Sequence, residues 1–130
     1  MDGIIRKKVM LCHATRIGNR IVASACREVD AVFDTGAPKS VLHPRVAPIA
    51  YFPRGAPEPV RGAGGHARLP TTTAFLQAPG CSRIYVAPWI DKNLPEAFAV
   101  DVIVGDDYME AAYMHARPAE RPPDARCTPT

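Results

Sequence analysis

The stretch Ala31-Val32-Phe33-Asp34-Thr35-Gly36-Ala37-Pro38-Lys39-Ser40-Val41-Leu42 combines an apolar run, a sharp turn and a single carboxylate. The three apolar residues predict a short buried strand that ends at Asp34. Gly36 has no Cβ, so the backbone can turn tightly after the carboxylate. The Thr35 hydroxyl can donate and accept, so it can bond to a neighbouring copy of the loop. The triplet Asp-Thr-Gly alone is a weak signal, because any given triplet occurs by chance in roughly two or three per cent of chains of this length, and its flanks are what make it informative.

The composition predicts one β-rich domain with a tail. A chain of 130 residues, 47% of them apolar, is long enough to bury a core. Fourteen prolines and an aromatic content of 7% favour short strands joined by turns over a helical bundle. We expect the domain to span residues 1–115. Residues 116–130 are rich in Pro and Arg and predict a flexible C-terminal tail.

Charge and hydropathy favour neither a nucleic acid nor a membrane as partner. The net charge of +3 is mild, and the basic residues are scattered apart from Arg6-Lys7-Lys8. No apolar run reaches membrane-spanning length, and the N-terminus lacks the apolar segment of a signal peptide. We therefore expect a cytoplasmic protein, or one released from a longer polyprotein.

The cysteines and histidines form no pattern that is typical of a metal site. The four cysteines lack Cys-x-x-Cys spacing, and the four histidines form no helical pair. The neighbours Cys12 and His13 would point to opposite faces of a strand. We expect no metal and no cofactor, and we expect free thiols rather than disulfides in an intracellular chain.

The first and middle parts of the chain predict further strands. Residues 4–15 and 20–25 are expected to pair as a hairpin around Gly18-Asn19, with a polar break at Arg27-Glu28 before the next strand. Residues 43–59 contain five prolines and predict a loop. Residues 71–76 and 84–87 predict strands because they are β-branched and aromatic, with Pro79-Gly80 as the turn between them.

The late part of the chain predicts a strand followed by a helix. An apolar run ends at Gly105, and Asp107 with Glu110 three residues later resembles a capping box. Met109, Ala112 and Tyr113 would form the buried stripe of this helix. The pair Asp106-Asp107 could also hold a cation, but helix capping accounts for it more simply.

A glycine-rich segment, Gly62-Ala63-Gly64-Gly65, lies between two short extended segments. This pattern predicts a mobile hairpin tip. A phosphate-binding loop is not indicated, because neither a Gly-Lys-Ser/Thr ending nor a helix follows.

Three motifs together resemble the retropepsin-like (retroviral-type) aspartic proteases. They are Asp34-Thr35-Gly36-Ala37-x-x-Ser40-Val41-Leu42, Gly62-Ala63-Gly64-Gly65 and Ile103-Val104-Gly105-x-Asp107, in the order of that family and within about residues 20–114. The resemblance implies a mainly β protein, a closed antiparallel β-barrel with one short C-terminal helix. It also implies a C2 homodimer with its active site on the two-fold axis.

The resemblance implies a role for each motif. Asp34 would be the catalytic carboxylate of each subunit. The active-site loop would be supported by Thr35, Gly36 and Ala37. The flap that closes over an extended peptide would consist of Arg61, Gly62, Ala63, Gly64 and Gly65. Ile103, Val104 and Gly105 would pack behind the active site.

The chemistry of aspartic proteolysis also points to a dimer. The reaction uses two carboxylates that share one proton. Only one Asp-Thr-Gly is present, and a C2 dimer supplies the second Asp34. The function implied is an aspartic endopeptidase acting on a peptide or polyprotein substrate, with self-processing from a viral-type precursor as an extension of it.

Some positions depart from the family pattern, and two other functions stay open. Lys39 and Asp106 stand where many viral members carry an acid and an arginine, so a reversed Lys39–Asp106 ion pair is a hypothesis. The tail after His115 offers no evident interface strand, so the dimer would be either weak or built mainly from residues 1–15 and the active-site loops. The alternatives are a catalytically silent retropepsin-like dimerisation or peptide-binding module, and a generic β-barrel that binds nucleic acid through Arg6-Lys7-Lys8.

Overall fold

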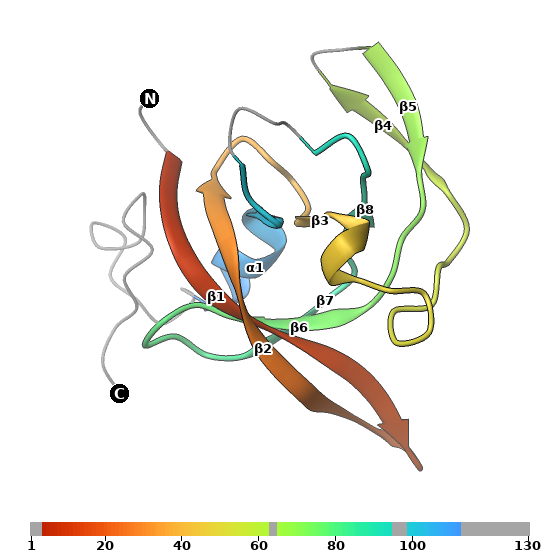
Figure 1. Cartoon of the computed structure of the whole chain (residues 1–130), viewed down its shortest axis with the longest axis vertical. Helices are drawn as coiled ribbons and strands as arrows, with labels where there is room; N and C mark the ends of the chain where they lie inside the picture. Colours follow the sequence, from red (N-terminus) through yellow and green to blue (C-terminus); the bar gives the residue numbers. More distant parts are fainter. Residues whose placement is uncertain (1–3, 63–64, 95–98, 113–130) are drawn as a thin grey trace.

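The computed structural model describes residues 4–62, 65–94 and 99–112, and these form a mainly β fold with one α-helix (Figure 1). The tail 116–130, Tyr113 and the flap-tip residues Ala63 and Gly64 lie outside the described residues. The strands are β1 (Ile4–Ile17), β2 (Arg20–Asp34), β3 (Val41–Leu42), β4 (Glu58–Gly62), β5 (Gly65–Leu69), β6 (Ala74–Gln77), β7 (Ile84–Val86), β8 (Trp89–Ile90) and β9 (Val102–Val104). The helix α1 spans Asp106–Ala112, and a 3₁₀ turn spans Pro44–Val46.

Seven strands form one curled sheet in the order β7-β6-β1-β2-β9-β3-β8, and β4 and β5 form a separate hairpin. The edge strands β7 and β8 are joined by Ala87-Pro88 alone, so the sheet must curl until its two edges approach each other. Within the described residues the sheet is a curled half-barrel, and the segment before β6 meets β8 through the isolated bridge between Thr71 and Trp89. Full closure of the barrel stays a prediction.

The sheet is mixed, which differs from the expected antiparallel arrangement. The pairs β2–β9 and β3–β8 are parallel, whereas β1–β2, β1–β6, β6–β7 and β3–β9 are antiparallel. In the parallel pair, Phe33 lies opposite Val104, so both strands end at the same edge. The turn after Asp34 and the turn at Gly105 are therefore neighbours in space.

The long hairpin β1–β2 turns at Gly18, which has a φ of +61°. The predicted polar break at Arg27-Glu28 is wrong, because both residues lie within β2, opposite Leu11 and Met10. Their side chains are exposed while their backbones stay paired. Polar side chains on the solvent side of an antiparallel pair do not interrupt it.

A β-bulge in this hairpin brings two cysteines together. Leu11 pairs with Arg27 and His13 with Ser24, so two residues of β2 stand opposite Cys12. One of these, Ala25, takes a φ of +49°, and the other, Cys26, forms a disulfide with Cys12. The expectation of free thiols is wrong for the described part of the chain, which contains no free cysteine.

The core lies between the curled sheet and α1. Phe33 and Tyr108 are among its largest fully buried side chains, and Met109 and Ala112 also pack against it, as the helical stripe predicted. The Tyr108 hydroxyl donates to the Ser82 carbonyl at 2.9 Å and accepts from the Ala78 amide at 2.8 Å. Burial raises the pKa of Tyr108, so this bonded hydroxyl stays neutral and fastens α1 to the loop after β6.

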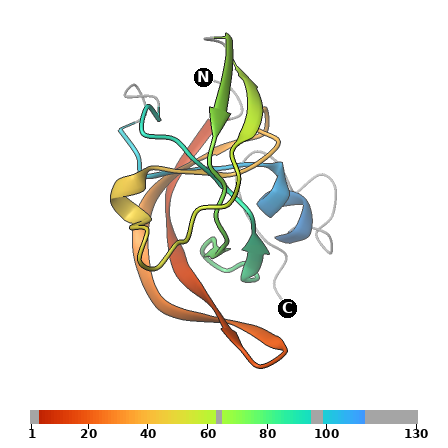
Figure 2. The same cartoon turned by 90° about the vertical axis from the view of Figure 1, so that its right-hand side faces the viewer.

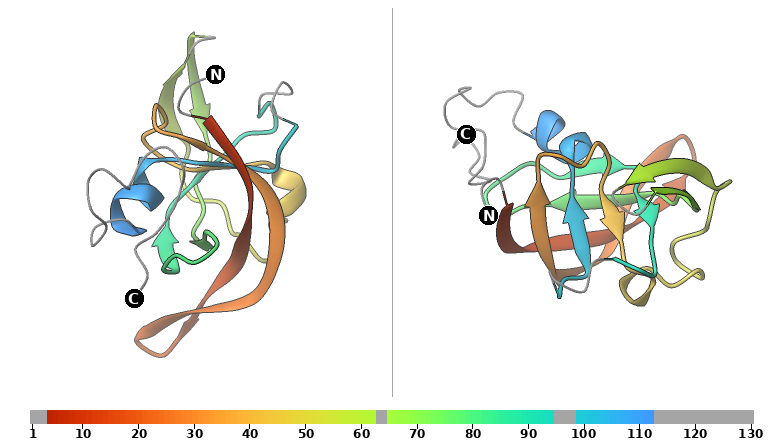
Figure 3. Two further views of the ribbon diagram at one scale, coloured as in Figure 1. Left: turned by 90° about the vertical axis from the view of Figure 1, so that its left-hand side faces the viewer. Right: turned by 90° about the horizontal axis from the view of Figure 1, so that it is seen from above.

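The β4–β5 hairpin and the β1–β2 turn project from opposite ends of the molecule (Figure 2). Seen from above, α1 lies close to the end of β9, beside the turn that follows β2 (Figure 3). Among the described residues, no helix has the length and apolar character needed to span a membrane.

Candidate active site

Asp34 is the last residue of β2, and its carboxylate is partly exposed at the turn. The Gly36 amide donates to Asp34 Oδ1 at 2.9 Å, and the Ala37 amide donates to the Asp34 carbonyl at 3.1 Å. Thr35 and Gly36 are exposed. The turn therefore orients one carboxylate and leaves its surroundings open to a ligand or to a second copy of the chain.

The turn at Gly105 packs directly against the active-site loop. A Cβ at position 105 would lie 2.7 Å from the carbonyl oxygens of Ala37 and of Lys39, so only glycine allows this approach. The Asp106 amide donates to the Ala37 carbonyl at 2.8 Å. The structure thus brings together two of the predicted motifs, residues 34–37 and 103–105, through the parallel pair β2–β9.

Ser40 and Asp107 join the active-site loop to α1. Asp107 Oδ1 accepts the Ser40 hydroxyl at 2.8 Å, and both of its carboxylate oxygens are 3.0 Å from the Ser40 amide. The Ser40 hydroxyl, which is fully buried, accepts in turn from the Gly105 amide at 3.0 Å. Charge-assisted bonds of this kind are stronger than neutral ones. They hold the loop that carries Asp34 in place.

Sequence reasoning missed this network. It assigned Asp107 to helix capping, and Asp107 Oδ1 does accept from the Tyr108 amide at 2.8 Å, but its other bonds go to Ser40. The available signal was the pairing of a serine six residues after Asp34 with an acid two residues after Gly105. Only the tertiary structure shows that the two positions meet.

The ion pair proposed between Lys39 and Asp106 is not present. Lys39 Nζ instead bonds to Glu58 Oε1 at 3.0 Å, and the ammonium lies 5.1 Å from the centroid of the Trp89 ring. Asp106 is surrounded by other acids: its pKa is raised, first by burial and then by the negative charges of Glu110, Asp107 and Asp34. An acid in this position repels further negative charge at the active-site edge.

The Lys39–Glu58–Trp89 contact anchors the base of the β4–β5 hairpin. Glu58 is the first residue of β4, and its Oε1 also accepts from Trp89 Nε1 at 2.7 Å. The Trp89 bond, followed by the Lys39 bond, lowers the pKa of Glu58. The carboxylate therefore stays ionised further into the acid range, and the anchor persists there.

The described residues of β4 and β5 form the hairpin predicted around the glycine-rich segment. Arg61 lies opposite His66, and Gly62 lies opposite Gly65, at the end of the ladder. No ladder connects this hairpin to the main sheet in the described residues. The predicted residues Ala63 and Gly64 lie outside them, so the flap role of residues 61–65 stays a prediction.

A small apolar cluster flanks the active-site loop. It consists of Val32, Leu94, Val100 and Ile103, with Ala37 and Val41 packed against it. Val32 and Ala37 stand on either side of the Asp34 turn in the chain. The predicted support residue Ile103 belongs to this cluster, whereas Val104 faces the main core.

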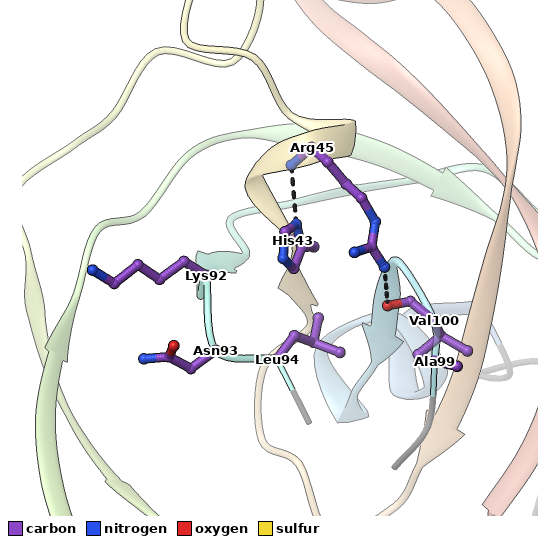
Figure 4. A pocket seen from close by; sticks show the side chains of 7 residues that line it. All are labelled: His43, Arg45, Lys92, Asn93, Leu94, Ala99 and Val100. Carbon is purple, nitrogen blue, oxygen red and sulfur yellow. Dashed lines mark hydrogen bonds between the residues drawn. The ribbon is translucent and has the colours of Figure 1, made fainter. Parts of the chain in front are cut away.

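A cavity of about 540 Å³ beside β3 does not include Asp34 (Figure 4). Its wall contains His43, Arg45 and Lys92, but Arg45 is already engaged by the Asp101 carboxylate at 2.6 Å and the Val100 carbonyl at 3.0 Å. In the part of the chain that the structure describes, no three His, Cys, Asp or Glu side chains gather as a metal site would require.

Comparisons with known proteins support the fold. No protein-family model matches the chain, and no curated protein matches its sequence. A solved structure of the EIAV protease in complex with the inhibitor HBY-793 is similar, with 18% identity and a TM-score of 0.53. The alignment covers 87% of this chain and 89% of that protease. The likeness concerns the fold, and the chain thus has a retroviral protease as a structural neighbour.

Proposed function

We propose that this protein is an aspartic endopeptidase that works as a homodimer. The observation that carries the proposal is the Asp34 carboxylate, oriented by the Gly36 amide at an open turn, in a fold similar to that of a retroviral protease. The fold alone does not imply an activity, so the proposal rests on the turn and its chemistry.

In the proposed mechanism the Asp34 carboxylates of two subunits meet on the two-fold axis and share one proton, because two like charges so close cannot both ionise. The ionised carboxylate takes a proton from a water molecule, which attacks the peptide carbonyl carbon. The protonated one donates to the carbonyl oxygen. The C–N bond then breaks as the carboxyl that took the proton from water passes it to the leaving nitrogen, and the other carboxylate recovers its proton from the gem-diol hydroxyl. Thr35 and Gly36 would brace the paired loops, and Ser40, Gly105 and Asp107 would hold each loop from behind.

The substrate class follows from the flap and the open turn. An extended peptide or polyprotein segment would lie between the β4–β5 hairpin and the two Asp34 turns, adding a strand to the site.

We propose a domain of residues 1–115, and either a cytoplasmic location or release from a viral-type polyprotein.

The test is hydrolysis of an unfolded protein by the full chain between about pH 4 and pH 7, with and without pepstatin. We expect cleavage that pepstatin inhibits and a bell-shaped pH profile from the shared proton. The rate per chain should increase with the concentration of the chain, because only dimers are active. The variant Asp34→Asn should lose about 10³-fold or more in rate while keeping its fold and its association state, measured by circular dichroism and sedimentation.

Two results would contradict the proposal. Cleavage that survives Asp34→Asn would assign the activity to another residue. A stable dimer that binds peptide and cleaves at no pH would favour the catalytically silent dimerisation or peptide-binding module.

A further inference from the structure

A second cavity, of about 200 Å³, lies between the β1–β2 hairpin and the segment that contains the 3₁₀ turn and the loop after it. Its wall is mostly apolar or aromatic and contains no carboxylate: it consists of Leu11, His13, Ala25, Arg27, Val46, Pro48, Tyr51 and Phe52. Apolar cavities of about 150 Å³ admit a benzene molecule. This cavity can therefore hold one aromatic ring or a short aliphatic group.

Three stacked rings form an aromatic wall on one side of this cavity. The His13 ring lies parallel to the Tyr51 ring, with centroids 4.8 Å apart and planes within 8°, and Phe52 meets His13 edge-on at 4.9 Å. Phe52 is buried in the main core, whereas 59% of the Tyr51 surface is exposed. The wall is thus fixed to the core at one end and open to solvent at the other, so a ligand can reach it.

The register of the hairpin places Arg27 on the face that borders the cavity. Arg27 lies directly opposite Leu11, and opposite residues of an antiparallel pair point to the same face. The Leu11 side chain is buried in the main core, so this is the inner face of the hairpin. Arg27 itself is exposed. Its guanidinium therefore borders the cavity on the side that is open to solvent.

Arg27 has no counter-charge in the part of the chain that the structure describes. The ion pairs there are Lys8–Asp30, Lys39–Glu58 and Arg45–Asp101, and no hydrogen bond engages the Arg27 guanidinium. A guanidinium carries five N–H donors in a planar fork that matches the two oxygens of a carboxylate. The cavity thus combines an available bidentate donor with an aromatic wall.

The β-bulge in the hairpin holds this wall in place. Ala25 has a φ of +49°, and the next residue, Cys26, is bonded to Cys12. Bulges redirect the side chains beside them, and Ala25 and His13, on either strand of the bulge, both line the cavity. The disulfide keeps the two strands together at this point. The wall is formed before any ligand arrives, which reduces the entropic cost of binding.

We propose that this cavity binds a small carboxylate with an apolar body, such as an aromatic acid, whose ring lies against Tyr51 and whose carboxylate bonds to the Arg27 guanidinium. Two sources carry this chemistry: a free aromatic acid, and the C-terminal residue of a peptide. Residues 27 to 34 of β2 span roughly 20 Å of extended strand, so the cavity is separate from the Asp34 turn. The site is independent of the proposed proteolytic activity.

The test uses calorimetry of the full chain with three matched probes. Phenylacetate has both the ring and the charge, phenylacetamide has the ring alone, and acetate has the charge alone. We expect phenylacetate to bind and the other two to bind at least about tenfold more weakly, because each lacks half of the contacts. The proposal is overturned if phenylacetate does not bind, or if phenylacetamide binds as tightly as phenylacetate does.

A fourth probe distinguishes the two sources of the carboxylate. N-Acetyl-glycyl-phenylalanine offers a free C-terminal carboxylate next to an aromatic ring, and its C-terminal amide lacks the charge. Tighter binding of this acid than of phenylacetate assigns the site to the C-terminal residue of a peptide. Equal or weaker binding assigns it to a free acid. Equal affinity of the peptide acid and its amide would contradict the role of the carboxylate.

NMR spectra of the full chain locate the bound probe. Phenylacetate should shift the methyl signal of Ala25 and the ring signals of Tyr51, because both residues line the cavity. The amide signal of Gly36, in the turn after Asp34, should stay unchanged. A shift at Gly36 with none at Ala25 would place the probe at the active-site turn and overturn the proposal.

Variants of the wall test the two contacts separately. Arg27→Gln should weaken phenylacetate binding about tenfold or more, because it removes the charged donor. Tyr51→Ala should weaken binding about threefold or more, because it removes a ring from the wall. Arg16→Gln is the matched control: Arg16 is exposed on the same hairpin, but its position three residues after His13 places it on the opposite face. This variant should bind as the wild type does.

The variants can also contradict the proposal. An equal loss in Arg16→Gln and Arg27→Gln would mean that net charge alone attracts the probe, and unchanged affinity in Arg27→Gln would remove the guanidinium from the site. Arg27→Lys keeps the charge without the planar fork, so affinity equal to that of the wild type would contradict bidentate binding. If Tyr51→Ala fails to fold, Tyr51→Leu replaces it, and wild-type affinity in that variant would contradict the role of the ring.

Discussion

The loop that carries Asp34 and the β4–β5 hairpin are attached to the sheet in different ways. The loop lies between two strand ends and is held by the buried Ser40 hydroxyl and the Asp107 carboxylate. The hairpin forms its own two-stranded sheet, and its base is anchored by an ion pair in which both side chains are partly exposed. Regions with few buried contacts open at lower free energy. The molecule thus combines a firmly held carboxylate with a loosely attached hairpin.

Of the changes that test this difference, removal of the Asp107 carboxylate should have the largest effect, because it loosens the loop that carries Asp34. Asp107→Ala leaves the Ser40 amide, the Ser40 hydroxyl and the Tyr108 amide without their acceptor. We expect a loss of about 3 kcal/mol in the free energy of unfolding, measured by urea denaturation. A double-mutant cycle with Ser40→Ala should give a coupling energy above about 0.5 kcal/mol. If the losses of stability in Asp107→Ala and Ser40→Ala simply add in the double variant, the Ser40–Asp107 network does not hold the loop.

A methyl group at position 105 should have the next largest effect. Gly105→Ala places a Cβ against the carbonyl oxygens of Ala37 and Lys39, and backbone atoms cannot yield as a flexible side chain would. We expect a loss of about 2 kcal/mol in stability, together with reduced proteolysis. Gly80→Ala is a useful contrast, because a Cβ there meets no atom within 4 Å and any loss comes from the positive φ of 73° alone. Wild-type activity in Gly105→Ala would contradict the supporting role of this turn.

Loosening the hairpin should alter substrate binding more than stability. Lys39→Met removes one partner of Glu58 at the base of β4, and an ion pair that is open to solvent contributes little to stability. We expect a severalfold change in KM with a nearly unchanged urea midpoint. Lys8→Met, which breaks the exposed pair with Asp30 on the β1–β2 hairpin, is the matched control and should leave KM unchanged.

Substitution of Asp106 should have the smallest effect on stability, and this effect should depend on pH. Its pKa is raised in the folded protein, so the folded state holds this proton more tightly than the unfolded chain does. Ionisation therefore destabilises the fold as the pH rises above the ordinary value of 3.8. Asp106→Asn should be more stable than the wild type at pH 7, by less than about 1 kcal/mol after solvent screening, and the gain should vanish below about pH 3.5. If the difference in stability between Asp106→Asn and the wild type stays constant across this pH range, the raised pKa of Asp106 is contradicted.

The sequence pattern correctly predicted those structural features that depend only on residues close together in the chain. The apolar run 31–33, the glycine turn at Gly18 and the amphipathic stripe of α1 each require only a short segment to recognise. The Asp34 turn belongs to this group, since its first bond joins residues two apart. Two of the wrong predictions concern pairs distant in the chain: the disulfide between Cys12 and Cys26, and the Glu58 partner of Lys39. The third, the polar break at Arg27-Glu28, was wrong because the pairing of β2 with β1 continues through these residues.

The amino-acid sequence alone determined a β-rich chain, a carboxylate at the end of a buried strand and a glycine-rich segment suited to a hairpin, because periodicity and turn chemistry act over a few residues. Tertiary structure decided the register of β1 with β2, the parallel pair β2–β9 and the bonds that join Ser40 to Asp107. The physical reason is that strand pairing brings together residues as far apart as 40 and 107. A pattern of a few residues does not specify which strand will pair with the edge of which other strand.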